Sequence, residues 1–336
     1  MSLFILACDF ETSREVQGMN RDYVIGIDGG GTRSRGVAMG MNGECLRRVE
    51  SGALNFNTIP PDEFLRHLTQ LFEGLFAKPS LGRCVRAVIG TAALFHEATV
   101  DEKAAVLRGV DLGSIEEVSV VGDGVTAVSG AAGGVEATLV IAGTGSIVVR
   151  QTQDGRVAFA GGLGPLIGGD PGSAFWMACE AIKEVQRQFC LRGELCPMGK
   201  LLCDYFGVPG LYGLVSEVHR DPEGRKKLAA SAQILSESSQ SDIVEPWSRI
   251  EERAGQELAR LVGDLFPSPS AMSEEIFVSG SVLLKNERVR KALILALNTK
   301  GKKIVRLREP QYDAAMGAGF IALRQIQSGP MEDERR

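Results

Sequence analysis

Apolar residues follow two different spacings in the first third of the chain, and each spacing predicts a kind of element. Residues 24–27 and 84–89 are apolar runs of strand length, and residues 33–41 alternate between apolar and polar positions, which also indicates a strand. Between Phe64 and Phe76 the apolar residues recur at helical spacing. The other elements predicted here are a strand over 44–50, a helix near 99–109, a strand over 117–121 and a helix directly after it. The predicted order is βββ-α-β-α-β-α.

The second half of the chain repeats this order. The elements predicted there are strands over 138–142, 147–151 and 157–160, a long helix from about 175, a strand over 275–279, a helix over 286–298, a strand over 303–307 and a last helix over 313–326. Residues 191–270 interrupt the repeat and are predicted to be a mainly helical insertion.

Turn residues repeat together with the strands. A glycine turn after the first strand begins at Gly29 in one half and at Gly143 in the other, 114 residues later. Hairpin turns begin at Asn42 and Asp154, 112 residues apart. Because two different features share nearly one offset, we predict an internal duplication. It gives an α/β chain with one domain over 21–135 plus 313–328, a second over 136–312, and a cleft between them.

The stretch around Asp28 is the first candidate site. Its three consecutive glycines, Gly29 to Gly31, let the backbone approach a bulky anion and adopt positive φ, and successive N–H groups then cradle phosphate. The Asp28 carboxylate can hold a hydrated Mg²⁺. A Walker A loop would need a lysine and a following helix, and a dinucleotide fingerprint would also need the helix. Neither pattern is present, and a plain hairpin turn remains the alternative.

Composition narrows the class of protein. The length of 336 residues suggests about two domains. An apolar content of 44% and a charged content of 24% are ordinary for a globular protein, and a net charge of −5 gives no support for nucleic-acid binding. No apolar run reaches the roughly 18 residues of a membrane span. We expect residues 1–20 to be a disordered leader, with Met19 as an alternative start.

Cysteine usage indicates a cytoplasmic protein. The seven cysteines form no disulfide framework, which fits a reducing compartment. Four of them, Cys179, Cys190, Cys196 and Cys203, lie within 25 residues, but their spacings match no metal-binding pattern.

Taken together, the duplicated halves and their loops resemble the sugar kinase, Hsp70 and actin ATPase superfamily. Within it the chain is similar to the BadF/BadG/BcrA/BcrD ATPase family, whose best-defined members are N-acetylglucosamine kinases. The resemblance covers about residues 22–326. It depends on the segments 26–34 (phosphate 1), Asp123, 143–146 (phosphate 2), 168–176, 278–281 (adenosine) and 314–319. It implies duplicated actin-like ATPase domains of the ribonuclease H-like type.

This resemblance also implies a site. Asp123 would be the general base that takes a proton from a sugar hydroxyl, and Asp28 would hold Mg²⁺ through water. The residues implied to bind ATP are Gly29, Gly30, Gly31, Thr32, Arg33, Gly143, Thr144, Gly145, Ser146, Gly280 and Ser281. Those implied to line the sugar site are Asn55, Thr91 and Asp170. The partner would be a small-molecule sugar, with no nucleic acid and no membrane, and the insertion could support a homodimer.

The residues themselves leave structural alternatives open. Asp123 and Asp170 each precede a helix and could be N-cap residues. Asn55 could be a turn residue, and Gly280 could end a strand. His67, His96 and His219 are isolated in the sequence and receive no role.

Two departures from the family pattern leave the sugar undefined. Amino-sugar kinases usually have Gly-Trp-Gly where this chain has Leu163 between glycines, and they have Glu where it has Pro171. Two other functions are alternatives to a hexose or amino-sugar kinase. An activator of a 2-hydroxyacyl-CoA dehydratase or benzoyl-CoA reductase would hold a [4Fe-4S] cluster with cysteines after phosphate 2, but residues 147–178 contain none. A non-catalytic sugar-binding regulator is the other alternative.

Overall fold

The computed structural model describes residues 22–76, 82–92, 94, 98–113, 115–221, 223–268, 271–300 and 304–328. The predicted leader and His96 lie outside these ranges. The chain divides into two compact units. The first unit holds the described residues of Met1–Ala137, Gln151–Val157 and Pro310–Arg336, and the second holds those of Thr138–Arg150 and Ala158–Glu309.

The first unit contains a five-stranded mixed sheet in the order β3-β2-β1-β4-β5. Its strands are β1 (Tyr23–Gly29), β2 (Arg33–Gly40), β3 (Cys45–Gly52), β4 (Cys84–Thr91) and β5 (Glu117–Gly122). β2 is antiparallel to both β1 and β3, whereas β1, β4 and β5 are parallel. The register sets Gly29 opposite Thr91, and Thr91 opposite Gly122. The three parallel strands therefore end at one level.

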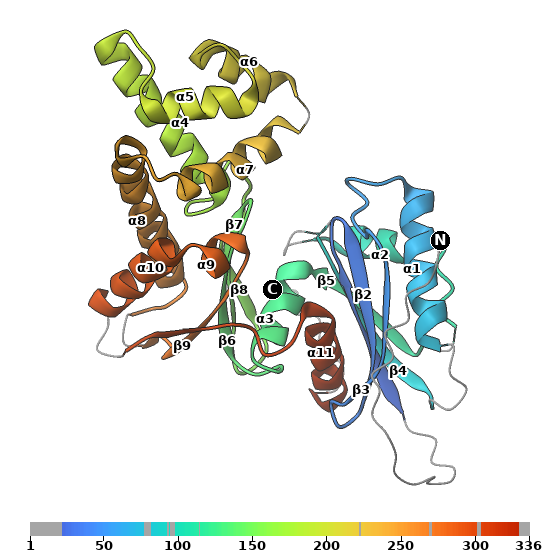
Figure 1. Ribbon diagram of the computed structural model, residues 1–336. Coiled ribbons are helices and arrows are strands. Elements are labelled where there is room, and N and C mark those ends of the chain that lie inside the picture. Colours follow the sequence, from blue (N-terminus) through green and yellow to red (C-terminus); the bar gives the residue numbers. More distant parts are fainter. Residues whose placement is uncertain are drawn as a thin grey trace, which may run out of the picture. The chain divides into compact units, whose positions relative to one another are not determined.

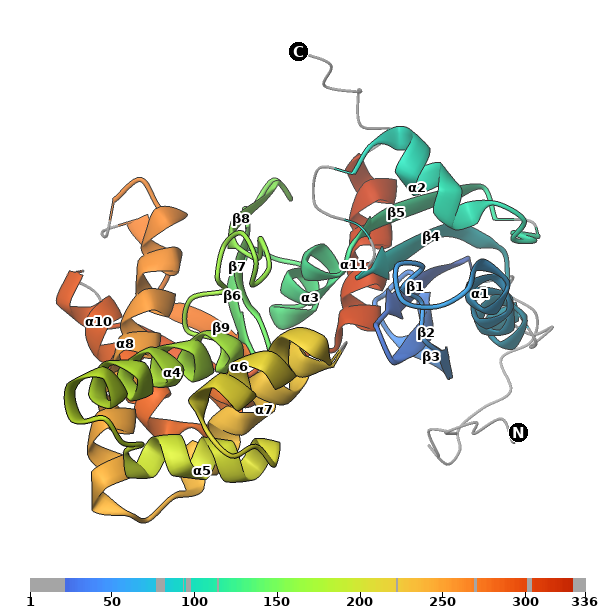
Figure 2. The same ribbon diagram turned by 90° about the horizontal axis from the view of Figure 1, so that it is seen from above.

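Helices cover both faces of this sheet (Figures 1 and 2). They are α1 (Pro61–Phe76), α2 (Val100–Leu107), α3 (Asp123–Ala131) and α11 (Ala314–Ser328). Because side chains alternate along a strand, Ile25 and Ile27 join the core under α1 and α2, while Val24 and Met39 join the core under α11. The capping box of Thr99 and Glu102 starts α2 within the predicted range.

Glycines let α11 approach β1 and α3 closely. A Cβ at Gly26 would lie 2.2 Å from the Ala315 carbonyl oxygen, and one at Gly317 would lie 2.0 Å from the Thr126 carbonyl oxygen. Gly317 and Gly319 are thus packing residues, because the obstructing atoms at Gly317 belong to backbone, which cannot move aside cheaply. The start of α11 is held at the edge of the sheet where Asp28 and Asp123 lie.

The second unit contains a second five-stranded sheet, in the order β10-β9-β6-β7-β8. Its strands are β6 (Ala137–Ala142), β7 (Ser146–Gln151), β8 (Val157–Gly161), β9 (Glu275–Ser279) and β10 (Arg306–Arg308). β9 is parallel to β6 and to β10, and Ile141 lies opposite Ser279. β10 begins later than predicted, and residues 301–303 lie outside the described ranges.

Seven helices are described in the second unit: α4 (Ala174–Arg192), α5 (Pro197–Phe206), α6 (Leu211–Arg220), α7 (Gly224–Glu237), α8 (Ser241–Asp264), α9 (Ser281–Lys285) and α10 (Glu287–Lys300). The predicted helical insertion is confirmed as α5 to α8. Its apolar residues, such as Leu202 and Trp247, belong to the same core cluster as Val140 of β6. The insertion is therefore packed into the second unit and has no separate core.

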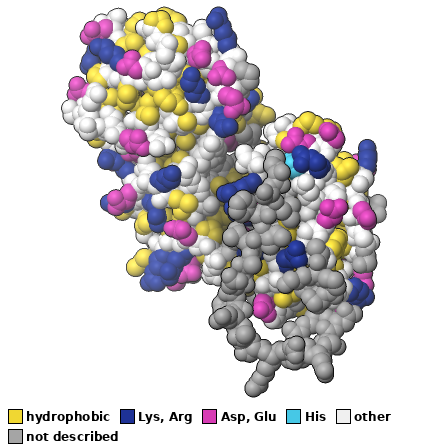
Figure 3. Space-filling view, turned by 45° about the vertical axis from the view of Figure 1, so that its right-hand side comes forward, with side chains coloured by type: hydrophobic (Ala, Val, Ile, Leu, Met, Phe, Trp, Pro, Cys, Tyr) yellow, Lys and Arg dark blue, Asp and Glu magenta, His cyan; other side chains and the backbone are white. Residues whose placement is uncertain are grey.

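On the face shown in Figure 3, basic and acidic side chains are interspersed with apolar ones. Among the described helices, none is long and apolar enough to cross a membrane.

Replacing Gly317 by alanine is expected to destabilise the chain. The new methyl group would meet the Thr126 carbonyl oxygen inside the contact of α3 with α11, and overpacking of this kind costs roughly 3 kcal/mol. Chemical denaturation measures the effect. Gly263→Ala is the matched control, because a Cβ at that helical glycine would have nothing within 4 Å; alanine there should be neutral or stabilising by about 0.5–1 kcal/mol. Equal stability of the two variants would contradict this packing argument.

Candidate functional site

In the first unit, two carboxylates lie at the edge of the sheet where the parallel strands β1, β4 and β5 end. Asp28 is the penultimate residue of β1, half-buried, and paired in register with Gly90 of β4 and Arg35 of β2. Asp123 follows β5 directly and is the first residue of α3. The two side chains are close enough for the charge of Asp123 to raise the pKa of Asp28. The carboxyl ends of parallel strands are where open α/β sheets bind ligands.

Both carboxyl groups have raised pKa values. Burial raises the pKa of Asp28 to about 6, Asp123 and Asp313 add to the shift, and Arg35 opposes it. Asp123 is exposed to solvent. The protein around it still removes part of its hydration and raises its pKa, while hydrogen bonds from the backbone N–H groups of Gly124 and Asp123 lower it in part. Excess negative charge therefore collects at this edge.

The N-cap alternative for Asp123 is wrong. The N-cap of α3 is Gly122, and no side chain caps this helix end. The Asp123 carbonyl oxygen accepts a hydrogen bond from Thr126 Oγ1 at 2.9 Å in the first turn of α3. This side chain is available for chemistry at the end of the sheet.

The glycine turn after β1 differs from the prediction in its backbone. None of Gly29, Gly30 and Gly31 has positive φ. Glycine is needed at the first two positions because of close packing. A Cβ at Gly29 would lie 2.8 Å from the Gly90 carbonyl oxygen, and a Cβ at Gly30 would lie 2.7 Å from the Arg33 carbonyl oxygen. Gly31 has nothing within 4 Å, and it is exposed together with Thr32 and Arg33. An anion can therefore reach this end of the turn.

Asn55 and Thr91 lie beside this turn and hold one loop. Leu54 N–H donates to the Gly30 carbonyl oxygen at 3.0 Å, and the buried Thr91 hydroxyl donates to the Leu54 carbonyl oxygen at 2.8 Å. Asn55 Oδ1 accepts from the Asn57 N–H at 3.0 Å, which is an Asx turn. This hydrogen bond supports the alternative in which Asn55 is a turn residue. The bond made by Thr91 places Asn55 next to the glycine turn.

Sequence reasoning missed His67, which supports the same loop. Its Nδ1 lies 2.8 Å from the Ala53 carbonyl oxygen, and because a carbonyl only accepts, Nδ1 carries the proton. Its ring packs on Gly52, where a Cβ would lie 2.2 Å from the nearest ring atom. His67 is adjacent to Leu68 on the buried side of α1, and this position was the available sign of a structural role.

Asp313 was also missed. Its Oδ1 accepts from the Met316 N–H at 2.9 Å, which is the N-cap pattern, and its Oδ2 pairs with Arg48 Nη1 at 2.5 Å. Asp313 is the first residue of the helix predicted over 313–326, and an aspartate at that position could have indicated this cap. The pair ties β3 to the start of α11 and leaves a third carboxylate near Asp28.

In the second unit, the turn over Gly143–Ser146 is fixed to the start of α4. The carbonyl oxygens of Gly143 and Thr144 accept from the N–H groups of Ala174 at 2.9 Å and Phe175 at 3.3 Å. Ser146 is buried, and its hydroxyl donates to the Pro171 carbonyl oxygen at 2.8 Å. Thr144 is exposed. Within this turn, Thr144 has the side chain that a ligand can reach.

The structure brings the Gly280–Ser281 segment to this turn. Gly280 has φ 90°, and a Cβ there would lie 2.3 Å from the Ala142 carbonyl oxygen. A Cβ at Gly143 would lie 3.8 Å from Ser281 Oγ. Both segments follow the parallel strands β6 and β9, so the register of the sheet places them side by side.

Asp170 has the most unusual surroundings of the predicted residues. Among the described residues it is the one non-glycine residue with positive φ, 45°, and it is 5% exposed. Its Oδ1 is buried without a hydrogen-bond partner, and Oδ2 would lie 2.7 Å from a Cβ at Gly145. Burial raises the pKa of Asp170, while a hydrogen bond from the Gly164 backbone N–H lowers it in part. Strain and an unpaired buried oxygen together are typical of functional positions.

The N-cap alternative for Asp170 is wrong as well. Ser173 caps α4, and its Oγ accepts from the Trp176 N–H at 3.1 Å. Leu163, at one of the two departures from the family pattern, is 58% exposed, while the Pro171 carbonyl oxygen is bonded to Ser146. In the described part of the chain, no group of three or more His, Cys, Asp or Glu side chains is arranged to hold a metal ion by itself.

Two known kinases are similar to the chain. It is 29% identical over 309 residues to the N-acetylmuramic acid/N-acetylglucosamine kinase of Clostridium acetobutylicum, spanning 89% of this chain and 98% of that one. It is 28% identical over 189 residues to the N-acetyl-D-glucosamine kinase of Dictyostelium discoideum, spanning 50% and 55% of the two chains.

Solved structures show the same fold. A candidate N-acetylglucosamine kinase from Chromobacterium violaceum matches with a TM-score of 0.64 and 22% identity over 90% of this chain and 99% of that one. A ROK family glucokinase from Streptomyces griseus, in complex with glucose and AMPPNP, matches with a TM-score of 0.51 and 17% identity over 90% and 99%. The predicted fold of duplicated actin-like ATPase domains is confirmed.

The family follows from the extent of its match. The model of the BadF/BadG/BcrA/BcrD ATPase family matches residues 25–322, which include both glycine turns and every predicted site residue. The chain belongs to the BadF/BadG/BcrA/BcrD ATPase family.

Proposed function

We propose that this chain is an ATP-dependent kinase that phosphorylates a hydroxyl of an amino sugar or hexose. The observation that carries the proposal is the meeting of Asp28 and Asp123 at the level edge of three parallel strands, next to an exposed glycine turn. The similarity to a sugar kinase over 98% of that relative supports it.

Phosphoryl transfer depends mainly on positioning and on stabilising the charge of the moving group. In this proposal Asp123 accepts the proton of the acceptor hydroxyl. Loss of hydration raises the pKa of Asp123, which makes its carboxylate a stronger base. A carboxylate that caps no helix and reaches solvent fits this role.

ATP is the phosphoryl donor in this proposal. Backbone N–H groups and exposed side chains of the first glycine turn would contact its phosphates, as would those of the Gly143–Ser146 turn. The residues are Gly29, Gly30, Gly31, Thr32, Arg33, Gly143, Thr144, Gly145 and Ser146. Gly280 and Ser281, which lie beside Gly143, would contact the adenosine. Because the hydroxyl of Ser146 is bonded to Pro171, its contribution would come from the backbone.

The residues around Asp28 fit a hydrated Mg²⁺. Burial and the negative charges of Asp123 and Asp313 raise the pKa of Asp28, and the positive charge of Arg35 offsets only part of this shift. Mg²⁺ keeps several waters and takes few protein carboxylates, so a single half-buried Asp28 suffices. When bound, the ion would neutralise charge on the phosphates.

The acceptor would lie against Asn55, Thr91 and Asp170. Thr91 holds the Asn55 loop in place through Leu54, so its part is to position Asn55. The unpaired Oδ1 of Asp170 is an acceptor that a ligand hydroxyl or a bound water would satisfy. Leu163 presents an apolar side chain on the preceding loop, where contact with a non-polar substituent of the sugar is favourable.

We propose a cytoplasmic location and a homodimer as further properties. None of the described cysteines is joined in a disulfide bond, which fits a reducing compartment. Leu191 and Tyr212, at 72% and 79% exposure, are large apolar side chains on the helices α4 and α6, and a second copy of the chain would cover them in this proposal.

A panel of sugars tests the function. ATP consumption is expected to rise sharply with one of N-acetylglucosamine, glucosamine, N-acetylmuramate or glucose, and to cease when EDTA removes Mg²⁺. Activity independent of every sugar, in a brown protein that contains iron, would indicate the dehydratase activator in place of a kinase. Sugar binding in calorimetry without turnover would indicate the regulator.

The Asp123→Asn variant tests the base. Its kcat is expected to fall about 10²- to 10⁴-fold, because the amide cannot accept the hydroxyl proton, while ATP binding is retained. Asp101→Asn, which changes an exposed carboxylate in α2, is the control and should keep full activity. An Asp123→Asn variant as active as the wild type would exclude Asp123 as the base.

The stability of the Asp28→Asn variant at different pH values tests the effect of the negative charge at this site. The pKa of Asp28 rises from 3.8 to about 6 on folding, so the ionised group disfavours the folded state. Below about pH 4 it is protonated in both states and costs nothing; the cost grows between about pH 4 and 6 and is complete above that. In magnesium-free buffer at pH 8 the variant should therefore melt a few degrees above the wild type, and the two should converge near pH 4.

Glu73→Gln, an exposed carboxylate of α1, should show no such pH-dependent gain. An Asp28→Asn variant that melts below the wild type at pH 8 would show that Asp28 has a compensating partner.

A further inference from the structure

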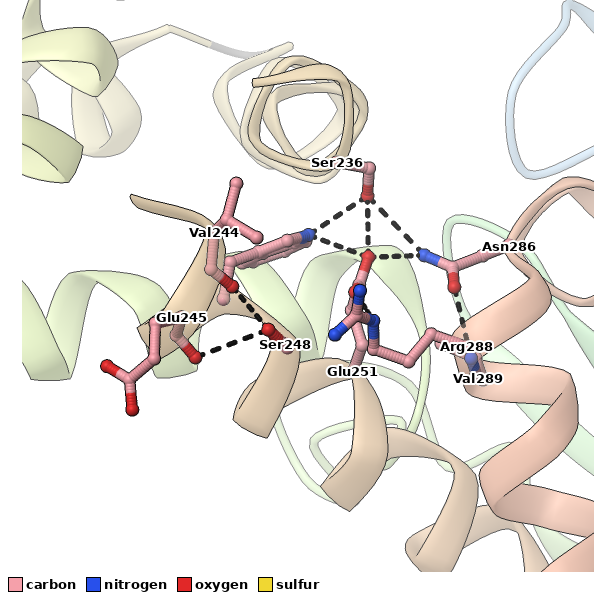
Figure 4. A network of polar contacts seen from close by, with 9 residues as sticks. Ser236, Val244, Glu245, Ser248, Glu251, Asn286, Arg288 and Val289 are labelled. Carbon is pink, nitrogen blue, oxygen red and sulfur yellow. Dashed lines mark hydrogen bonds and ion pairs between the residues drawn. The ribbon is translucent and has the colours of Figure 1, made fainter. Parts of the chain in front are cut away.

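A buried carboxylate in the helical insertion is bound by four side chains (Figure 4). Glu251 of α8 is 6% exposed. Its Oε1 accepts hydrogen bonds from Trp247 Nε1 at 2.8 Å, Ser236 Oγ at 3.0 Å and Asn286 Nδ2 at 2.6 Å. Its Oε2 pairs with Arg288 Nε at 3.1 Å. The network joins α7 and α8 to the junction of α9 and α10.

Such a network is not needed to fill the core. Glutamate is almost never buried unless it is paired, and replacing a buried ion pair by apolar residues of similar volume is often neutral or stabilising. What polar contacts add is direction: each fixes one donor relative to the carboxylate. Three of the donors belong to the insertion or to α10, but Asn286 belongs to the short segment that follows Gly280–Ser281.

Asn286 joins the carboxylate to that segment through short covalent and hydrogen-bonded steps. It ends α9, and its N–H donates to the Val282 carbonyl oxygen at 2.9 Å. At the other end of α9, the Leu284 N–H donates to the Gly280 carbonyl oxygen at 3.0 Å. The Oδ1 of Asn286 also accepts from the Val289 N–H at 3.0 Å and so caps α10. One side chain thus fixes the end of α9 to both α8 and α10.

Gly280 tolerates little displacement. It has φ 90°, and its Cα faces the Ala142 backbone so closely that a Cβ would lie 2.3 Å from the carbonyl oxygen. A small rotation of α9 would therefore move Gly280 and Ser281 against Ala142 and Gly143. The position of this segment is set at one end by β6 and at the other by the contact between Asn286 and Glu251.

We propose that Glu251 is a positioning residue for the nucleotide. Through Asn286 it holds α9 so that Gly280 and Ser281 lie beside the Gly143 turn in the geometry that accepts ATP. This inference depends on the proposed nucleotide site. It gives the insertion a role in binding ATP without direct contact with the ligand.

The test measures ATP binding by calorimetry in the absence of sugar, together with steady-state kinetics, for Glu251→Gln. The amide keeps the size of the side chain but loses the charge, and its nitrogen cannot accept from the donors around it. The Kd and KM for ATP are expected to rise about tenfold, the scale of one charge-assisted hydrogen bond. The KM for the sugar should remain within about twofold of the wild-type value, because Glu251 makes no contact with the sugar in this proposal and substitutions away from a site usually have small effects.

Three further variants separate positioning from general stability. Asn286→Ser keeps a capping oxygen but is too short to reach Glu251, so it should reproduce the ATP effect. Leu214→Ala removes a buried side chain of α6 and should lower stability without changing the Kd for ATP. Glu252→Gln changes the exposed neighbour of Glu251 and should change neither quantity.

A double variant tests whether the contact between residues 251 and 286 can be restored. Combining Glu251→Gln with Asn286→Asp exchanges amide and carboxylate, and it should restore ATP binding at least partly. Unchanged ATP binding in Glu251→Gln, or an equal rise in KM for ATP and sugar, would overturn the inference while the kinase function stands. Weaker ATP binding in a chain that phosphorylates no sugar would uphold the inference and reject the kinase. A wild-type chain that does not bind ATP would overturn both.

Discussion

The site in the first unit depends on the register of three parallel strands. Because Gly29, Thr91 and Gly122 lie opposite one another, β1, β4 and β5 end together, and the residues next to these ends converge without long loops. The register brings Asp28 close to Asp123. Burial and this neighbouring negative charge both make ionisation of Asp28 less favourable. A shift of one residue in β5 would turn the strand over and remove this proximity.

The closeness of α11 to β1 is a second condition, and glycine sets it. Gly26 and Gly317 leave no room for a Cβ, so the helix lies directly on backbone and brings Asp313 to the same edge. The second unit uses the same device at Gly280, which lies against Ala142. In both units, residues without side chains determine how near the functional groups can lie, and the polar contacts of Arg48 and Asn286 then fix the helices that follow.

Much of this arrangement could be predicted from the sequence. Apolar spacing and the repeated turns gave the order of strands in both halves, because strand periodicity and Asn-Gly or Asp-Gly turns are local properties. Gly43 and Gly155 have positive φ, but Asn42 and Asp154 do not, so neither pair forms the type I′ turn that Asn-Gly and Asp-Gly favour. The positive φ expected over Gly29 to Gly31 was predicted wrongly, because Gly29 is needed for close packing against Gly90 of β4 and Gly30 for the close approach of the Arg33 carbonyl oxygen. The strain at Asp170 and the role of Glu251 involve contacts between distant residues, which no spacing reveals.

Asp170 illustrates how one residue can serve two opposed requirements. Its backbone has φ 45°, where glycine would be at ease and a residue with a side chain costs free energy, while its carboxylate is buried with one oxygen unpaired. Selection for thermal stability alone would favour glycine at this position, since it removes both costs at once. Selection for the proposed acceptor site retains the carboxylate. Position 170 is therefore one at which thermostability and activity are expected to trade against each other during directed evolution.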